Sequence, residues 1–186
     1  MNQHGAPLVT IGRLDRPIME ANLTNALRVE DEVMSEFGTT YSHESWRSSH
    51  FLADRPGKWD LSVGAFFDRE LGGFLIASLD GADTHCHRLA IDRRLRRGEV
   101  GSRLLEAVVP LAIAARSSRI TPSVRANNER AQRLFQRVGY EFMNGSELEG
   151  YASRTGRQRE GQAILTSGYE YRMMCKHLRH AARAGF

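Results

Sequence analysis

Residues 89–108 read LAIDRRLRRGEVGSRLLEAV: a short apolar strand, a turn rich in arginine and glycine, and the start of an apolar helix. A helix N-terminus presents unpaired backbone N–H groups and the positive end of the helix dipole, so a phosphate group is its natural ligand. Gly98 and Gly101 would let a ligand approach the backbone, and Arg96 and Arg97 would add charge-assisted contacts. The stretch therefore predicts a phosphate or pyrophosphate site, with ordinary turn and capping chemistry as the alternative.

The composition is that of a globular protein with a basic balance. The 186 residues carry a net charge of +4 and a sequence pI of about 9.4, which favours anionic ligands without choosing among nucleotides, nucleic acids and acidic substrates. Cys86 and Cys175 stand far apart in the sequence and predict no disulfide framework. No apolar run approaches the ~20 residues that span a membrane, and no signal pattern opens the chain, so we expect a cytoplasmic protein.

Hydrophobic periodicity predicts an α/β fold with a mixed sheet. Helices are expected over 17–38, 44–52, 102–115 and 128–139, the third of them kinked at Pro110. Strands are expected over 6–14, 61–67, 71–79, 84–92, 120–126 and 168–178, with a short strand starting at Tyr140. Residues 144–167 are expected to form a long polar loop, either functional or disordered.

Two blocks of the sequence resemble the signatures of the GNAT superfamily of acyl-CoA-dependent N-acyltransferases. The family's acyl-CoA signature is Q/R-x-x-G-x-G/A between a hydrophobic-Ala-Val strand and a Leu-Leu helix, and residues 89–108 follow that layout. The second signature is a strand, Asn-x-x-Ala, and a helix ending in Leu-Tyr-x-x-x-Gly-Phe; VRANNERAQRLFQRVGYEF at 124–142 is similar to it. The hairpin VGAFFDRELGGFLIAS at 63–78 also looks like the family's central meander.

The resemblance implies one GNAT-like domain over residues 1–186. Its fold would be a mixed, mostly antiparallel central sheet flanked by helices, with a V-shaped splay between the central strands. Its activity would be N-acetyl transfer from acetyl-CoA to a primary amine, directly in a ternary complex, with a main-chain N–H near Leu89 polarising the acyl carbonyl. The residues implied in donor binding are Leu89, Ala90, Ile91, Arg96, Arg97, Gly98, Glu99, Val100, Gly101, Ser102, Asn128 and Phe135. Asn128 is equally well explained as a helix cap alone.

Three positions depart from the family's pattern. Glu99 stands where the signature has its first glycine, and a carboxylate facing a pyrophosphate is unfavourable, so we expect its side chain to point to solvent. Phe135 replaces the tyrosine that commonly protonates the leaving thiolate, although a thiol pKa of about 8.5 makes CoA a fair leaving group unaided. Ser123 stands where several protein-acetylating relatives carry a glutamate base. The last two departures favour a small-molecule amine as the acceptor.

A histidine pair just before the acyl-binding strand is the candidate general base. An alkylammonium must lose a proton before it attacks a carbonyl, and histidine titrates near neutrality. Strand alternation places His85 and His87 on one face and Cys86 on the other. The alternative is a pair of surface histidines without a role.

No metal is expected. With Cys86 on the opposite face, two histidines offer fewer ligands than a metal site needs. Cys175 and His177 form a second pair of the same spacing, and the family's layout would not place their strand beside the histidines.

Acceptor contacts are expected from two segments that border the acceptor site in the family, the turn between the first two helices and the long loop. The candidate residues are Tyr41, Trp46, Glu149 and Tyr151, with disorder of the loop's tip as the alternative. The acceptor is left open among a small amine, an amino sugar, an antibiotic and a protein amine. Homodimers are common in the family, and the sequence does not decide on one.

Two other function classes compete with an enzyme. One is nucleic-acid binding by the basic cluster Arg88, Arg93, Arg94, Arg96, Arg97 and Arg103, although no adjacent aromatic run or known nucleic-acid motif accompanies it. The other is an acyl-CoA sensor that binds the donor without turnover, which the departures at Glu99, Ser123 and Phe135 would permit. Salt dependence separates the first class from an enzyme, and turnover separates the second.

Overall fold

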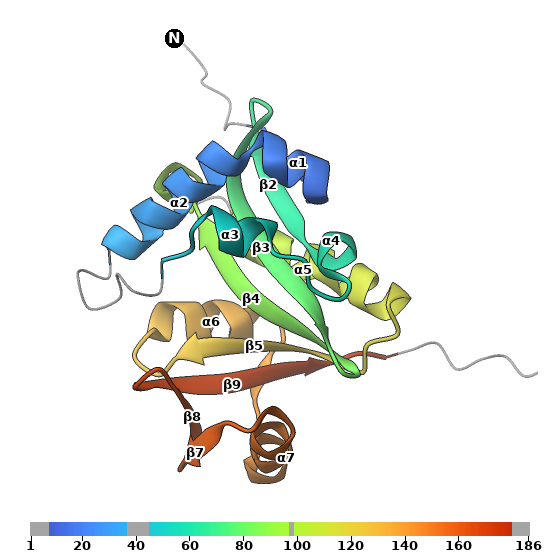
Figure 1. Cartoon of the computed structure of the whole chain (residues 1–186), viewed down its shortest axis with the longest axis vertical. Coiled ribbons are helices and arrows are strands. Elements are labelled where there is room, and N and C mark those ends of the chain that lie inside the picture. Colours follow the sequence, from blue (N-terminus) through green and yellow to red (C-terminus); the bar gives the residue numbers. More distant parts are fainter. Residues whose placement is uncertain (1–7, 37–44, 97–98, 180–186) are drawn as a thin grey trace, which may run out of the picture.

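The computed structural model describes residues 8–36, 45–96 and 99–179 (Figure 1). Its sheet has the strand order β1-β2-β3-β4-β5-β9-β8-β7, and β6 pairs with β9. Every pair is antiparallel except the central one, β4 with β5. This is the mixed, mostly antiparallel sheet that the sequence predicted. The strands are β1 (Val9–Arg13), β2 (Val63–Phe67), β3 (Glu70–Asp80), β4 (Asp83–Ile91), β5 (Arg119–Arg125), β6 (Glu141–Phe142), β7 (Gln158–Glu160), β8 (Ala163–Thr166) and β9 (Tyr169–His177).

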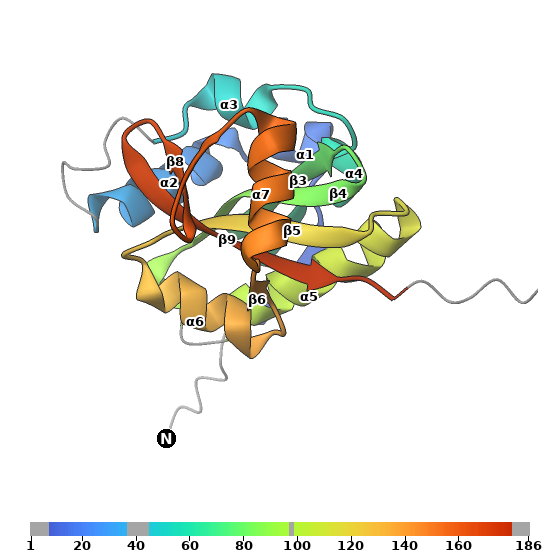
Figure 2. The ribbon, with the colours of Figure 1, turned by 90° about the horizontal axis from the view of Figure 1, so that it is seen from below.

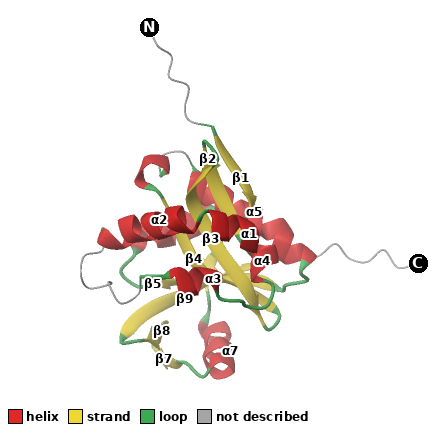
Figure 3. Cartoon of the chain, turned by 45° about the horizontal axis from the view of Figure 1, so that its top comes forward, coloured by secondary structure: helices red, strands yellow, loops and turns green. Residues whose placement is uncertain are grey.

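Helices cover both faces of the sheet (Figures 2 and 3). Those on one face are α1 (Arg16–Ala21), α2 (Leu23–Ser35) and α3 (Ser48–Leu52); those on the other are α5 (Val100–Ala114) and α6 (Glu129–Arg137). Two further helices are α4 (Lys58–Leu61) and α7 (Gly145–Thr155). None of the helices within the described residues is long and apolar enough to cross a lipid bilayer.

Strand β3 is buried on both faces because helices lie on both sides of it. Leu75 and Ala77 belong to the core beneath α5, whereas Phe74 and Ile76 belong to the core beneath α1, α2 and α3. A continuous apolar run is the sequence pattern of such a strand. Burial of each large apolar side chain stabilises the fold by about 2 kcal/mol.

The first predicted helix is two helices that meet at Asn22. Its side-chain Nδ2 donates to the Ile18 carbonyl at 2.9 Å, and its Oδ1 accepts from the Leu71 N–H at 3.3 Å. Asn22 thus ends α1 and fastens the helix pair to β3. Periodicity alone could not show this break, because apolar spacing continues through it.

The central strands β4 and β5 are paired over three residues only. Thr84, His85 and Cys86 pair in parallel with residues 120–122, and the pairing ends at Cys86 and Pro122. Proline lacks the N–H that would continue the ladder. Beyond this point the strands diverge (Figure 1), which is the V-shaped splay that the family resemblance implied.

A β-bulge lies in β4 at the start of the splay. Ile76 of β3 pairs with Arg88 and Ala77 pairs with Cys86, so His87 is the extra residue. A bulge of this kind changes the facing of the side chains that follow it. Cys86 and Leu89 accordingly contact the same core, although three positions separate them.

The segment 144–167, predicted as a polar loop, forms α7, β7 and β8, so that prediction was wrong. Asn144 accepts a hydrogen bond from the Glu147 N–H at 3.0 Å, and the Glu147 side chain accepts one from the Asn144 N–H at 2.9 Å. This capping box starts α7, and the sequence Asn-x-x-Glu could have shown it. Helix α7 then buries Leu148, Tyr151 and Ala152 against β8 and β9.

Candidate functional site

Two connected hollows lie at the splay of β4 and β5. The first, which we call the α5 cleft, is a space of about 320 Å³ between β4, the N-terminus of α5, α6 and the end of α2. Eight of the predicted donor-binding residues line it: Leu89, Ala90, Ile91, Arg96, Glu99, Gly101, Ser102 and Asn128. Val100 is buried in the core instead, Phe135 lines the second hollow, and Arg97 and Gly98 lie outside the described residues.

Arg96 is held against the wall of the α5 cleft. Its Nε donates to the Ile91 carbonyl at 2.8 Å, and its Nη1 donates to both carboxylate oxygens of Glu36. The remaining nitrogen, Nη2, is buried without a hydrogen-bond partner and lies 3.8 Å from Glu32 Oε1. A buried donor without an acceptor is unfavourable, and an anionic oxygen in the cleft would satisfy it.

Glu99 occupies a backbone conformation that favours glycine. Its φ is 58° and its ψ 11°, in the left-handed region, and no side chain caps the N-terminus of α5 that follows. An L-residue there is strained by about 1–2 kcal/mol. The family signature has glycine at this position, and the structure supplies the physical reason. The Glu99 side chain is exposed, as expected, and the residue lines the cleft.

Gly101 is needed for helix packing. A Cβ at this position would lie 2.9 Å from Leu134 Cδ2 and 3.1 Å from Ile91 Cδ1. Both neighbours also line the cleft. The absence of a side chain therefore lets α6 and β4 close around the start of α5, and this close packing shapes the cleft floor.

Arg130 and Arg137 of α6 also line the α5 cleft, and neither was among the residues predicted to bind the donor. Both side chains are exposed or partly exposed. Neither forms an ion pair or hydrogen bond within the part of the chain that the structure describes. With the N-terminus of α5, they offer positive charge for a phosphorylated ligand. Their spacing of seven residues on one helix face was the available sequence signal.

The second hollow, which we call the splay cavity, has a volume of about 480 Å³. It lies between the diverging ends of β4 and β5 and extends toward α3 and the β8–β9 turn. Leu89, Asn128 and Ala131 line both hollows, so the two meet where the strands part. Asn128 also caps α6, because its Oδ1 accepts from the Ala131 N–H at 3.1 Å.

His85 and His87 both line the splay cavity, with ring centroids 4.8 Å apart. His87 Nε2 lies 2.7 Å from Ser78 Oγ, and His85 Nδ1 lies 3.3 Å from Thr121 Oγ1. Burial lowers the pKa of His85 to about 4, helped by the charge of Arg157. Burial also lowers the pKa of His87 to about 3, with His85 and Arg55 contributing. This corrects the expectation of a histidine that titrates near neutrality: both imidazoles are neutral at pH 7.

The predicted acceptor contacts are only partly brought together. Trp46 lines the splay cavity, and its main-chain N–H donates to Glu30 Oε1 at 2.9 Å. Glu149 lies on the outer side of α7, where it forms an ion pair with Arg159 at 2.9 Å. Tyr151 is buried beneath α7, and its hydroxyl accepts from Arg157 at 3.1 Å. Tyr41 lies outside the described residues.

Phe135 offers no proton to the cavity, and its neighbour does not replace it. Phe135 is buried and packs edge-on against Tyr140 at 5.2 Å between centroids. Burial raises the pKa of the Tyr140 hydroxyl far above its usual range. That hydroxyl also does not line either hollow, so Tyr140 is not placed to protonate a leaving group.

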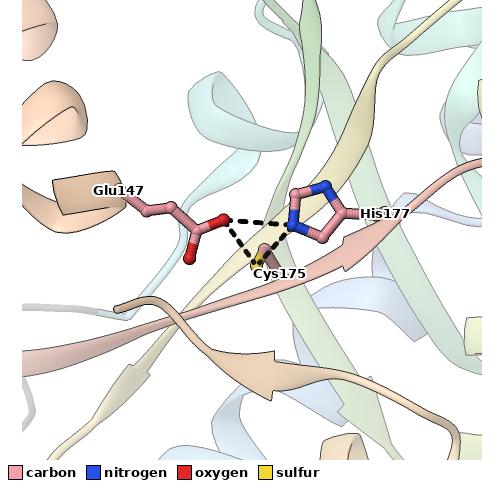
Figure 4. A group of neighbouring side chains, drawn as sticks. All are labelled: Glu147, Cys175 and His177. Carbon is pink, nitrogen blue, oxygen red and sulfur yellow. Dashed lines mark hydrogen bonds and ion pairs between the residues drawn. The ribbon is translucent and has the colours of Figure 1, made fainter. Parts of the chain in front are cut away.

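A second group of potential metal ligands, which lines neither hollow, consists of Glu147, Cys175 and His177. Figure 4 shows these three side chains. His177 Nε2 is 3.0 Å from Glu147 Oε1, and Cys175 Sγ is 3.8 Å from each of those two atoms. Arg119 Nη1 lies 3.5 Å from the same Glu147 oxygen. Burial, with the nearby charge of Glu147, raises the pKa of the Cys175 thiol to about 11. Hydrogen bonds and ion pairs explain why these three side chains lie together. A cation bound there would compete with Arg119 for the carboxylate and with the proton for the thiol.

Much of the basic cluster is neutralised within the fold. Arg88 forms a two-point ion pair with the buried Glu30, with Nε 2.9 Å from Oε2. Arg94 pairs with Asp92 at 2.6 Å, and Arg103 donates to the Val9 carbonyl at 2.9 Å. Among the described members of the cluster, Arg88, Arg94 and Arg96 are thus paired with carboxylates, which reduces the positive charge that they offer to a nucleic acid.

Comparison with known proteins identifies the family. A model of the acetyltransferase (GNAT) family matches residues 26–140. No curated protein gives a significant match to the chain. Among solved structures, ribosomal-protein-S18-alanine N-acetyltransferase from Escherichia coli has a TM-score of 0.64 at 18% identity, covering 96% of this chain and 99% of its own.

Two similar structures were solved with the donor or its product. The PaiA N-acetyltransferase from Thermoplasma acidophilum, in complex with coenzyme A, has a TM-score of 0.57 at 17% identity, covering 91% of this chain and 99% of that one. The yncA protein from Salmonella typhimurium, with its cofactor acetyl-CoA, has a TM-score of 0.65 at 13% identity, covering 96% and 98%. The fold, the α5 cleft and the family match together show that this chain belongs to the GNAT family of acetyltransferases.

Proposed function

We propose that the protein transfers an acetyl group from acetyl-CoA to the primary amine of a small molecule, directly and within a ternary complex. The observation that carries this proposal is the meeting of the two hollows at Leu89, Asn128 and Ala131. A donor in the α5 cleft would bring its acyl end to this junction, and an acceptor in the splay cavity would reach it from the other side. Holding both reactants at one point supplies much of the rate enhancement of such a reaction.

The residues of the α5 cleft fit the donor's phosphates. Donors for anionic oxygens come from the N-terminus of α5, from Arg96 Nη2, and from Arg130 and Arg137, none of which has a side-chain hydrogen-bond partner among the described residues. Acetyl-CoA, when bound, supplies an acetyl group activated as a thioester. The edge of β4 beyond Cys86 is not paired with β5, which supports the proposal because main-chain N–H groups near Leu89 would be available to polarise a carbonyl.

Proton transfer depends on how the splay cavity changes the pKa of a bound ammonium group. The burial and positive charge that lower the pKa of His85 and His87 also lower the pKa of an ammonium bound beside them. The acceptor would therefore be present as the neutral, nucleophilic amine. The neutral imidazole of His87, oriented by Ser78, can accept a hydrogen bond from the amine, and the proton released as the N–C bond forms would pass to the departing thiolate.

The shape of the splay cavity supports a small acceptor. Its volume of about 480 Å³ is in the range of small-molecule pockets. Residues 157, 166 and 167, next to α7 and β8, line one side, and Trp46 and His50 line another. These elements border the cavity, and a space bordered in this way suits a compact acceptor.

Binding and turnover must be tested separately, because an acyl-CoA sensor would share the binding. Calorimetric titration with acetyl-CoA and with CoA, at low and moderate salt, should give micromolar affinity at both salts. An amine screen should then release the CoA thiol, read with a colorimetric thiol reagent. Donor binding without thiol release for any amine would favour the sensor. Affinity for nucleic acid that falls steeply with salt, without donor binding, would favour the basic-cluster alternative.

A further inference from the structure

The charges around the splay cavity have one sign. Four arginines line it: Arg55, Arg88, Arg125 and Arg157. Among the described residues that line it, none is aspartate or glutamate. A cavity for an amine would ordinarily contain a carboxylate, because an ammonium is attracted to one. The charges here are the opposite of that expectation.

Two of the four arginines are engaged by the fold. The buried Glu30 neutralises Arg88 from behind the cavity wall. Arg125 is stacked 3.5 Å from the centroid of the Tyr169 ring and 5.1 Å from that of Tyr171. These contacts explain both residues as parts of the wall.

Arg55 and Arg157 have no carboxylate partner within residues 8–36, 45–96 and 99–179. Arg55 forms no side-chain hydrogen bond there either. Arg157 gives one side-chain hydrogen bond among the described residues, from Nη1 to the Tyr151 hydroxyl at 3.1 Å, so its other nitrogens would be available to a ligand. Acids in neighbouring segments are engaged by other residues: Asp54 pairs with Arg16 at 2.9 Å, and Asp80 and Asp83 lie by Arg154 at 3.8 and 3.2 Å.

The Arg55 backbone is held in place. The buried Lys58 donates to the carbonyls of Phe51 and Ala53 at 2.6 and 2.7 Å, and these bonds tie together the segment that carries Arg55. The Leu79 N–H donates to the Pro56 carbonyl at 2.7 Å and fastens that segment to β3.

The Arg157 backbone is also held in place. It follows the left-handed Gly156 (φ 64°) at the end of α7, and its N–H donates to the Ala152 carbonyl at 3.1 Å. Both guanidinium groups act electrostatically on both histidines. Both side chains also line the splay cavity together with the histidines, which places them within reach of an acceptor bound there.

We propose that the acceptor is a primary amine that also carries a carboxylate, as an amino acid does, and that Arg55 and Arg157 bind this carboxylate. The inference rests on the proposed function and names the substrate class of that site. A guanidinium matches a carboxylate in geometry as well as charge. Acceptors with several positive charges, such as polyamines and amino sugars, would be repelled by the same two groups.

The test compares amino acids with their primary amides. Each pair shares one side chain and differs in the carboxylate alone, and pairs with aliphatic, aromatic, thioether and acidic side chains cover different fits. Initial rates of thiol release with saturating acetyl-CoA give kcat/KM for each. The ammonium of an amide is more acidic, so reactivity alone would favour the amide. We expect the best amino acid to exceed its amide by about tenfold or more.

Three variants test whether Arg55 and Arg157 cause any preference for the carboxylate. Arg55→Gln and Arg157→Gln should each reduce the ratio of kcat/KM between acid and amide by about tenfold. Arg159→Gln is the matched control, since Arg159 is two residues from Arg157, pairs with Glu149 and lines neither hollow. It should keep the wild-type ratio. Acetyl-CoA affinity, measured by calorimetry, should stay within about twofold in all three and shows that each variant is folded.

Several results would overturn the inference. Amides acetylated as well as acids, or a preference that survives in both Arg55→Gln and Arg157→Gln, would refute it and leave the proposed function intact. Preferred acetylation of a polyamine or an amino sugar would do the same. If no amine of any class releases thiol while acetyl-CoA binds, the proposed function fails, and this inference fails with it.

Discussion

The charged residues that line the α5 cleft and the splay cavity are the opposite of those expected from the proposed ligands. The α5 cleft, which fits a donor rich in phosphate, contains the carboxylates of Glu36 and Glu99 among its arginines. The splay cavity, which would take an amine, contains arginines and no carboxylate among its described lining residues. From this comparison we expect the two acids to moderate the affinity for the donor, and we expect the acceptor to supply its own negative charge.

The largest expected effect comes from the pair that supports the wall of the splay cavity. Glu30 is fully buried, accepts from Arg88 at two points and accepts from the Trp46 N–H. Glu30→Gln leaves the largely buried Arg88 charge uncompensated and should reduce the free energy of unfolding by about 2–4 kcal/mol. Urea unfolding measures this loss through the transition midpoint.

The matched control for that pair is exposed. Arg133 and Glu129 lie 2.9 Å apart on the surface of α6, where both side chains are mostly exposed. Glu129→Gln should change the free energy of unfolding by less than about 0.5 kcal/mol. Equal losses in Glu30→Gln and Glu129→Gln would show that the buried pair does not support the cavity wall.

The next effect concerns the strained acid of the α5 cleft. Glu99→Gly removes both the unfavourable φ and the carboxylate, and should increase the free energy of unfolding by about 1 kcal/mol. It should also tighten acetyl-CoA binding by about tenfold, because a like charge leaves the phosphate site. Thermal unfolding and calorimetric titration measure the two effects.

Glu99→Gln separates strain from charge. It keeps the Cβ and therefore the strain, so it should tighten acetyl-CoA binding without raising the melting temperature. If neither variant binds the donor more tightly, the Glu99 carboxylate does not face the phosphates and the charge comparison fails for the α5 cleft.

Much of the α5 cleft could be predicted from the sequence, because most of its residues come from two short blocks, 89–102 and 128–137, and only Val33 and Glu36 come from elsewhere. Leu89, Gly101 and Asn128 are placed by strand, turn and helix signals within a few residues of one another. The splay cavity could not be predicted in the same way, because Arg55 and Arg157 lie 102 positions apart in the sequence. Their meeting depends on the register of the whole sheet.

The wrong predictions for α7 and for the histidine pKa values each have a physical cause. The capping box at Asn144 was overlooked, so α7 was taken for loop and Glu149 was expected at the site, whereas α7 turns it outward to Arg159. The histidines were correctly placed side by side, but their burial depends on residues from other elements. Their low pKa values could not be read from the local sequence.

A smaller effect concerns the pH dependence of stability. In the unfolded chain His85 and His87 have ordinary pKa values near 6.5, whereas in the fold these values are about 4 and about 3. Between these limits the unfolded chain binds more protons, so stability rises with pH and is lost as pH falls from about 6.5 toward 4. Melting temperatures over pH 4–8 should show this loss, and His87→Gln should show less of it.

The same two histidines should leave the rate profile flat near pH 6.5. Any rise of kcat/KM between pH 6 and 9 should follow the acceptor's ammonium, and its position should move with the pKa of the amine used. An inflection between pH 6 and 7 that disappears in His85→Gln or His87→Gln would contradict the neutral, buried pair and restore a near-neutral histidine base.

The smallest expected effect is that of a metal ion at Glu147, Cys175 and His177. Because Arg119 lies by the same carboxylate and the thiol is protonated, zinc chloride or a chelator should change the melting temperature and the acetylation rate by less than the error of measurement. Stabilisation by zinc that Cys175→Ala abolishes would show that this group does bind a cation.

Initial-rate kinetics with both substrates varied test the central claim most directly, namely that donor and acceptor meet at the junction of the two hollows. With acetyl-CoA and the best amine of the panel, double-reciprocal plots should intersect, because the ternary complex must form before the acetyl group moves. Parallel lines would indicate a covalent acetyl-enzyme and a ping-pong order. That result would contradict direct transfer across the junction at Leu89 and Asn128.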